Sequence, residues 1–214
     1  MMNVTIISLT ERSDDCVAVT FLLGQDGHED FETFLVSRAR FSQLKLSVGE
    51  ASADIYDEVS HYGKLYEACK QAMNFLAYGD CSRRKLIAKL RGKGVEPDIA
   101  EEAVSELETK GYINDIANAA REAERCARKL WGRRRISAAL YEKGYGEEAS
   151  RKAIFALEDA GIDFTENCAE LIRKRCDELP KDPKEKAKLF ASMTRYGYSA
   201  SEINSAIDKI KEEQ

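Results

Sequence analysis

The chain contains an internal repeat with a period of about 50 residues. The segment 81–115 (CSRRKLIAKLRGKGVEPDIAEEAVSELETKGYIND) recurs as 131–164 (WGRRRISAALYEKGYGEEASRKAIFALEDAGIDF), so that Gly94 corresponds to Gly144. A third copy places Gly197 at the same position. Six apolar positions recur in all three copies. In the first copy they are Leu86, Leu90, Val95, Ala103, Val104 and Leu107. A period that preserves apolar positions and glycines together indicates stacked structural repeats.

Each copy is predicted to contain three short helices. In the first copy, Tyr66, Cys69, Met73, Leu76 and Ala77 have the spacing of an apolar helical stripe. Ser82 is a suitable N-cap for the second helix, and Pro97 suits the first turn of the third helix, which Gly111 ends. In the third copy, Ala169, Ile172, Cys176 and Leu179 take the place of the stripe.

The N-terminal segment has a different pattern, rich in Val, Ile, Thr and Phe. It predicts three antiparallel strands over Asn3–Thr10, Cys16–Leu23 and Asp30–Ser37, with Asp26-Gly27 in the second turn. A short helix is expected over Arg38–Leu46, ended by Val48-Gly49. Ser52 then begins a longer helical tract, in which Gly63 is a candidate interruption.

These patterns predict a mainly α fold: an elongated stack of three tandem three-helix repeats, preceded by a small three-stranded β-meander. The predicted parts are the meander with its short helix (1–50), a helical connection (51–65) and repeats over 66–114, 115–164 and 165–214.

The sequence offers no catalytic or metal-binding motif. It lacks a phosphate loop, a dinucleotide fingerprint and an H-E-x-x-H segment, so we expect neither an enzyme nor a cofactor. The 6 cysteines form no C-x-x-C pair and only 2 histidines are available, which favours buried thiols over a metal site. No apolar run approaches the roughly 20 residues of a membrane span, so we expect a cytoplasmic protein.

The main chemical signal is a basic cluster at the start of the second helix of each repeat. Arg83-Arg84-Lys85 and Arg133-Arg134-Arg135 occupy equivalent positions, and Lys143 and Trp131 flank the second cluster. In the third repeat the cluster is diluted to Lys184, Lys186 and Lys188 around Glu185.

Such clusters can contact phosphates, as arginine does well, or an acidic protein groove. They can also be solvated helix faces without a partner. Trp131 can stack on a base or can be a packing residue at a helix junction.

Four segments of the chain resemble a known family. S-R-x-x-L over Ser82–Leu86, K-G-V over Lys93–Val95, L-E-x-K-G-Y-I-N-D over Leu107–Asp115 and W-G-R-R-R-I…L-x-x-K-G-Y over Trp131–Tyr145 resemble RecX proteins, which regulate the RecA recombinase. The resemblance covers about two thirds of the chain, from Tyr66 onward.

The resemblance implies a monomeric modulator, usually an inhibitor, that binds along the groove of the RecA–single-stranded DNA filament. Binding would restrain ATP hydrolysis, strand exchange and co-protease activity, with weak direct contact to DNA. The expected contact residues are Arg83, Arg84, Lys85, Arg133, Arg134 and Arg135, with Trp131 and Lys143 in secondary roles.

The alternative is a free-standing helical-repeat protein that binds nucleic acid without RecA. The net charge of −5 counts against this alternative, because a protein that depends on phosphate contacts is usually basic.

Overall fold

The computed structural model describes residues 3–25 and 28–213, which form two compact units. The first unit consists of the chain up to residue 79 together with 86–112, and the second consists of 80–85 together with 113 onward.

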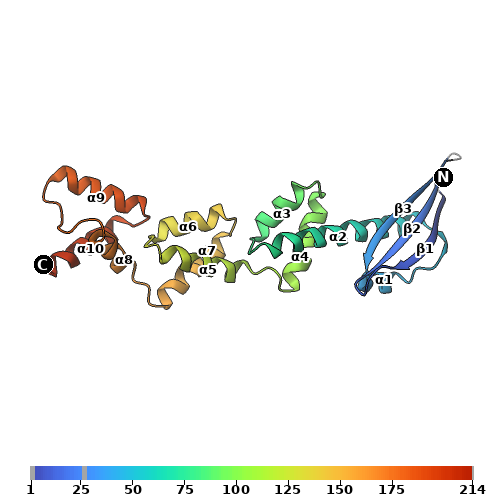
Figure 1. Ribbon diagram of the computed structural model, residues 1–214, viewed down its shortest axis with the longest axis horizontal. Coiled ribbons are helices and arrows are strands. Elements are labelled where there is room, and N and C mark those ends of the chain that lie inside the picture. Colours follow the sequence, from blue (N-terminus) through green and yellow to red (C-terminus); the bar gives the residue numbers. More distant parts are fainter. Residues whose placement is uncertain (1–2, 26–27, 214) are drawn as a thin grey trace. The chain divides into compact units, whose positions relative to one another are not determined.

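The first unit begins with an antiparallel sheet whose strand order is β3-β2-β1-β4 (Figure 1). Its strands are β1 (Asn3–Glu11), β2 (Cys16–Gln25), β3 (His28–Ser37) and β4 (Gly49–Ala51). The expected meander is confirmed, but the expected number of three strands is wrong, because β4 pairs with β1 through Val4 and Ala51. Three residues are too few to show the alternation that identifies a strand in a sequence. The predicted turn at Asp26-Gly27 lies outside the described residues.

Both helices of the N-terminal region lie on the same face of this sheet. Phe41 of α1 (Arg38–Leu44) and Tyr56 of α2 (Ala53–Ala77) pack against the core that Val19, Phe21 and Val36 contribute. The inner residues alternate along each strand with residues that point the other way. The sheet therefore has one covered face and one face that these helices leave open.

Gly63 does not interrupt the helical tract. Helix α2 continues through it and across the expected boundary between residues 65 and 66. A Cβ at Gly63 would lie 2.8 Å from the Cβ of Phe34, so the glycine allows the helix to approach the sheet closely. Glycine here serves packing rather than helix termination.

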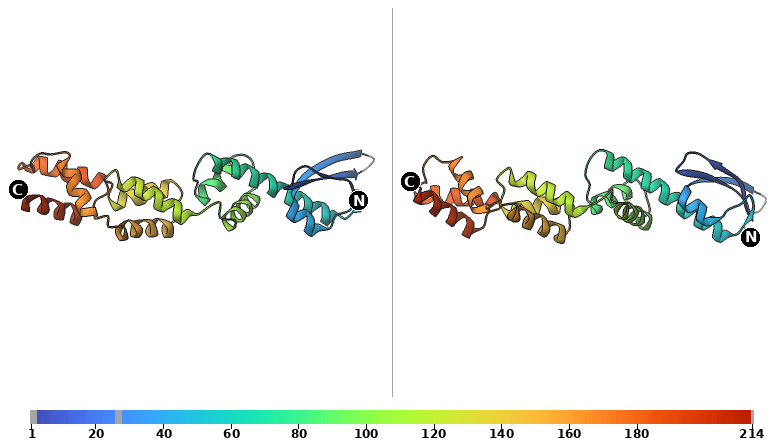
Figure 2. Two further views of the ribbon diagram at one scale, coloured as in Figure 1. Left: turned by 60° about the horizontal axis from the view of Figure 1, so that its bottom comes forward. Right: turned by 90° about the horizontal axis from the view of Figure 1, so that it is seen from below.

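The remaining chain forms helices in the expected triplets, and the mainly α class with three-helix repeats is confirmed. After α2 the helices are α3 (Arg83–Arg91), α4 (Pro97–Thr109), α5 (Asp115–Ala127), α6 (Arg133–Glu142), α7 (Glu147–Asp159), α8 (Phe164–Arg173), α9 (Pro183–Arg195) and α10 (Ala200–Glu212). Both views in Figure 2 show α8, α9 and α10 together as the C-terminal triplet (orange to red). The elongation of the stack and the limits of each repeat stay predictions.

The repeated glycines end the middle helix of every triplet. Gly94, Gly144 and Gly197 have φ of 88°, 88° and 94°, a conformation that L-residues rarely adopt. The residue after each glycine donates its N–H back to the carbonyl five residues earlier, as Tyr198 does to Met193 at 3.2 Å. This is the Schellman arrangement, and it explains why glycine recurs with the period of the repeat.

One part of the third predicted stripe lies outside a helix. Helix α8, the first helix of the third repeat, ends at Arg173. Cys176 and Leu179 therefore lie in the connection between α8 and α9. Both still pack against the core of the second unit. The apolar pattern correctly predicted that Cys176 and Leu179 contact the core, but it wrongly predicted that they are helical.

Candidate partner-binding surface

The second unit contains the same joint twice, where the start of a middle helix meets the glycine turn of the next repeat. At the first joint, the buried Ser82 hydroxyl donates to the backbone carbonyl of Lys143 at 2.7 Å. Any side chain on Gly144 would collide with that hydroxyl. Ser82 also accepts the N–H of Lys85 at 3.3 Å, which confirms it as the N-cap of α3.

At the second joint the backbone makes the corresponding contacts. The N–H of Gly132 donates to the carbonyl of Tyr196 at 2.8 Å, and the N–H of Arg134 donates to the carbonyl of Gly197 at 3.1 Å. A Cβ on Gly132 would overlap the backbone of Gly197. Two of the N–H groups at the start of α6 that lack a partner within the helix are thus satisfied by the next repeat.

The first two predicted basic clusters begin at these joints, whereas Lys184, Lys186 and Lys188 lie exposed on α9. In the first cluster, Arg84 and Lys85 are exposed, and the Arg84 guanidinium lies over the ring of Tyr141, 5.1 Å from its centroid. The backbone N–H of Arg83 donates to the carboxylate of Asp115 at 3.0 Å. The first cluster therefore presents two cations to solvent beside an exposed tyrosine.

The second cluster contains one arginine whose charge is paired within the fold and one that is exposed without such a pair in the described structure. Arg133 forms an ion pair with Glu158 at 2.7 Å and a second one with Glu202, and its guanidinium lies 4.3 Å from the ring centroid of Phe164. Arg134, the next residue, is exposed. The charge of Arg133 is therefore compensated within the fold, whereas Arg134 points to solvent.

Arg135 belongs to a cation–aromatic ladder, an alternating series of rings and positive charges. Its guanidinium lies 4.0 Å from the ring centroid of Trp131 and 4.9 Å from that of Tyr196. The ladder continues at both ends, with Arg175 at 4.5 Å from the Tyr196 ring and Lys129 at 5.3 Å from the Trp131 ring. Contacts of this kind contribute about 0.5–1 kcal/mol each at exposed sites.

Three members of the ladder were not expected to belong to a site. Lys129 lies two residues before Trp131 in the sequence, whereas only the fold brings Tyr196 to Arg135 and Arg175 to Tyr196. One feature of the sequence could have identified Tyr196 as a site residue. It directly precedes the glycine of its repeat, as Lys143 does in the repeat before.

Lys143 is held in an ion pair inside the second unit. Its Nζ lies 2.8 Å from Oε1 of Glu122, a carboxylate on α5 that is 7% exposed and also pairs with Arg125 at 2.6 Å.

The Cys126 thiol lies on the same helix as Glu122. Burial, and then the Glu122 carboxylate, raises the pKa of this thiol. This thiol is therefore protonated at neutral pH and behaves as a core residue.

Comparison with known proteins supports the sequence resemblance. A family model for the first three-helix domain of RecX matches residues 68–107. The Regulatory protein RecX of Xanthomonas axonopodis pv. citri (strain 306) is 33% identical over 138 residues, which cover 64% of this chain and 83% of that protein. The chain belongs to the RecX family. The RecX of Stenotrophomonas maltophilia (strain R551-3) is 28% identical over the same length.

Solved RecX structures share the fold. A crystal structure of regulatory protein RecX superposes with a TM-score of 0.70 at 19% identity, covering 96% of this chain and 99% of that chain. RecX from Lactobacillus salivarius gives a TM-score of 0.62 at 21% identity, over 69% of this chain and 97% of that chain.

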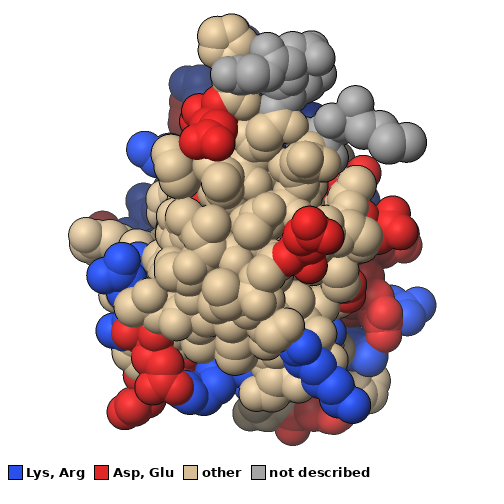
Figure 3. Space-filling model, turned by 90° about the vertical axis from the view of Figure 1, so that its right-hand side faces the viewer, with Lys and Arg blue, Asp and Glu red and all other residues tan. Residues whose placement is uncertain are grey.

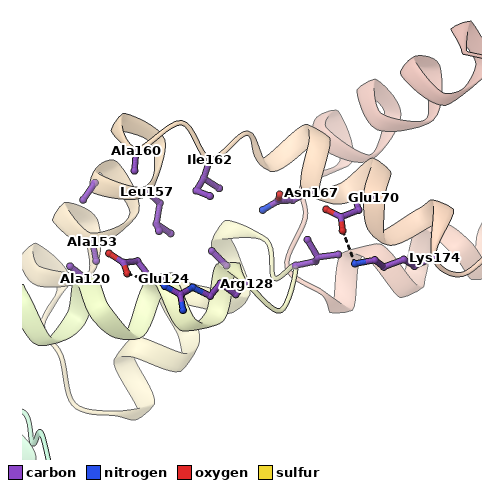
Figure 4. Close-up of a pocket in the computed structure, with 13 residues that line it drawn as sticks. Ala120, Glu124, Arg128, Ala153, Leu157, Ala160, Ile162, Asn167, Glu170 and Lys174 are labelled. Atoms are coloured by element: carbon purple, nitrogen blue, oxygen red, sulfur yellow. Dashed lines mark hydrogen bonds and ion pairs between the residues drawn. The ribbon is translucent and has the colours of Figure 1, made fainter.

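This RecX-family chain also has a groove of about 440 Å³ lined by α5, α7 and α8 (Figure 4). Its apolar floor includes Ala153, Leu157 and Ile162, and an ion pair at its rim joins Glu170 to Lys174 at 2.6 Å. None of the predicted contact residues lines the groove. It is separate from the basic clusters.

Two absences hold for the part of the chain that the structure describes. Over residues 3–25 and 28–213, no three His, Cys, Asp or Glu side chains gather in a way that could hold a metal ion. Over the same residues, no helix is both long and apolar enough to span a membrane.

Proposed function

We propose that this RecX-family protein is a non-enzymatic modulator of RecA, and specifically an inhibitor. It binds as a monomer along the groove of the RecA–single-stranded DNA filament in the cytoplasm. Once bound, it restrains ATP hydrolysis, strand exchange and co-protease activity.

The observation that carries this proposal is the recurrence of one exposed cationic surface at both joints. Arg84 and Lys85 at the first joint, and Arg134 and Arg135 at the second, follow helix starts that hydrogen-bond to the glycine turn of the next repeat. A surface that repeats suits a partner that repeats, since contacts of modest strength then add through multivalency. A filament of identical protomers is such a partner.

The contacts divide the proposed site residues by role. Arg84, Lys85, Arg134, Arg135 and Trp131 are proposed to meet the filament, since they are exposed or partly exposed at the joints. Arg133 and Lys143 are held by carboxylates of the fold, and Arg83 meets Asp115 through its backbone. We assign these three the secondary role of fixing the surface in place.

Titration of this protein into a RecA ATPase assay on single-stranded DNA tests the proposal. A fall in hydrolysis at substoichiometric ratios is expected, because one bound molecule restrains several protomers or blocks filament growth. Unchanged hydrolysis, together with no retention on immobilised filaments, would rule out the proposed function.

A second function, binding to nucleic acid without RecA, is favoured by the cation–aromatic ladder alone. Trp131 and Tyr196 are rings on which a base can stack where it displaces one of the cations that lie over them. Affinity for bare single-stranded DNA that falls steeply with salt would support it, because phosphate contacts release counterions. The net charge of −5 makes us expect weak binding in that assay.

A further inference from the structure

The outer side of α7 differs from the same side of its counterparts α4 and α10. It carries three exposed apolar residues, two on the helix and one at its C-cap: Phe155, Ala156 and Ala160. The corresponding residues in the other two repeats are all polar or charged: Ser105, Glu106 and Lys110 with α4, and Asp208, Lys209 and Glu213 with α10. Phe155 is 62% exposed. The second repeat is therefore apolar where the pattern of the other repeats is polar.

The two alanines line the groove between α5, α7 and α8 (Figure 4). In the other repeats the charged side chains at these positions form ion pairs, such as Lys110 with Glu106 at 2.5 Å and Lys209 with Glu166 at 2.5 Å. Alanine supplies no such pair and fills less space, so the groove stays open and apolar. An exposed phenylalanine next to an apolar groove is typical of an interaction surface.

The charges along α7 are arranged about Phe155. Arg151 lies one turn before Phe155 and Asp159 lies one turn after it, and both are exposed. Among the described residues neither forms an ion pair, whereas the neighbouring Lys152 and Glu158 are held in ion pairs within the fold. In an antiparallel pair of identical helices centred on Phe155, Arg151 of each helix faces Asp159 of the other. The outer side of α7 is thus complementary in charge to itself.

We infer that two copies of this chain associate through α7 in a two-fold, antiparallel contact. The Phe155 ring of each copy enters the groove of the other, and Arg151 of each copy pairs with Asp159 of the other. Such a self-complementary contact needs the ring and the groove beside each other on one surface, and Phe155 directly precedes the groove residue Ala156. The inference is independent of the proposed function, which uses no residue of α7.

Nucleic acid does not fit this surface. Helix α7 contains four acids and two bases, so phosphates would be repelled. The charged residues that line the groove balance one another, because Glu124 and Glu170 accompany Arg128 and Lys174. The occupant must therefore be apolar at its centre and carry one acid and one base at its ends, as a second α7 does.

The size of the contact predicts a weak dimer. A phenylalanine ring buries about 150–250 Å² at most, so two rings and the groove walls that meet them bury at most roughly 1,000 Å² in total. Stable interfaces bury about 1,200–2,000 Å². We therefore expect a dimer at high protein concentration that dissociates on dilution, which leaves the monomer of the proposed function.

The first test is sedimentation equilibrium of the full chain over a roughly hundredfold range of concentration, for wild type and for Phe155→Ser. We expect Phe155→Ser to raise the dissociation constant of the dimer at least about tenfold, because it removes the central aromatic anchor. Serine is the residue that the first repeat has at this position, Ser105.

The chain offers a matched control in Phe31→Ser. Phe31 is also 62% exposed, but it lies on the open face of the N-terminal sheet. Figure 3 shows that end of the molecule, where many surface side chains carry no charge. Phe31→Ser should leave the dissociation constant unchanged, so the control separates a contact at α7 from general association of exposed apolar residues.

The second test exchanges the charges. Arg151→Asp should raise the dissociation constant about tenfold, because both ends of a two-fold contact change from attraction to repulsion. The double variant Arg151→Asp, Asp159→Arg restores opposite charges and should return it to within about threefold of wild type. Circular dichroism and thermal unfolding establish that every variant folds.

Four outcomes would overturn the inference. They are a wild type that stays monomeric over the whole range, a dimer that survives Phe155→Ser, a dimer that Phe31→Ser dissociates equally, and a double variant as weak as Arg151→Asp alone. None of these measurements involves RecA, so failure of the dimer and failure of the proposed function are distinguishable.

Discussion

The Ser82 hydroxyl donates a 2.7 Å hydrogen bond to the backbone carbonyl of Lys143, 61 residues later in the chain. The same oxygen caps helix α3 by accepting the N–H of Lys85. One buried side chain thus fixes the helix on which a basic cluster begins and anchors it to the glycine turn of the following repeat. The orientation of the cluster depends on this contact.

Ser82→Ala should lower the free energy of unfolding by about 1–3 kcal/mol, since it removes an N-cap and leaves a carbonyl unsatisfied. Urea unfolding followed by circular dichroism measures the change. Ser42→Ala is the control, because Ser42 is exposed and its hydroxyl, among the described residues, bonds only to the Arg38 carbonyl one turn earlier on α1. Equal stability of the two variants would contradict a structural role for the joint.

Arg133→Ala should destabilise the protein by about 1–2 kcal/mol, whereas Arg134→Ala should change stability by less than about 0.5 kcal/mol. Arg133 neutralises Glu158 and Glu202 and covers the ring of Phe164, and the exposed Arg134 side chain makes no comparable contact in the described structure. Chemical denaturation of both variants provides the comparison. The reverse order would mean that the ion pairs do not persist in solution.

The double variant Arg134→Glu, Arg135→Glu should weaken filament binding at least about tenfold, more at low salt than at high salt. Helicity should be retained, because both residues lie near the start of α6 on its surface. The control is Arg151→Glu, Lys152→Glu on α7, which reverses the same number of exposed charges outside the joints. Similar losses for both double variants would point to net charge rather than to the site.

We expect the first unit to lose stability at alkaline pH when the Tyr56 hydroxyl ionises. Its hydrogen bond to the Glu32 carboxylate raises the pKa of Tyr56 to about 12, from 10.0. A folded-state pKa above the unfolded value stabilises the fold below pH 10, and this contribution is lost as the pH rises from about 10 to 12. Urea unfolding at pH 9 and pH 11 should therefore show a smaller difference for Tyr56→Phe than for wild type, by about 1 kcal/mol. Parallel pH dependence of the two proteins would contradict the assignment.

Much of the fold could be predicted because its signals are local. A backbone φ near +90° is accessible mainly to glycine, so Gly94, Gly144 and Gly197 recur wherever a middle helix ends. Apolar residues that recur with them are buried, as Leu86 and Ile136 are at 0% exposure. Strand β4 could not be predicted, because its three residues carry no local pattern and pairing with the distant strand β1 decides its conformation.

The sequence by itself determined the repeat, its helix ends and the position of each basic cluster. Only the tertiary structure decided what each cation does. Arg133 and Arg134 are identical neighbours, but successive side chains on a helix point about 100° apart. One therefore meets Glu158 and Glu202 from α7 and α10, while the other faces solvent. The carboxylates that make this distinction lie 25 and 69 residues away, beyond the reach of any local pattern.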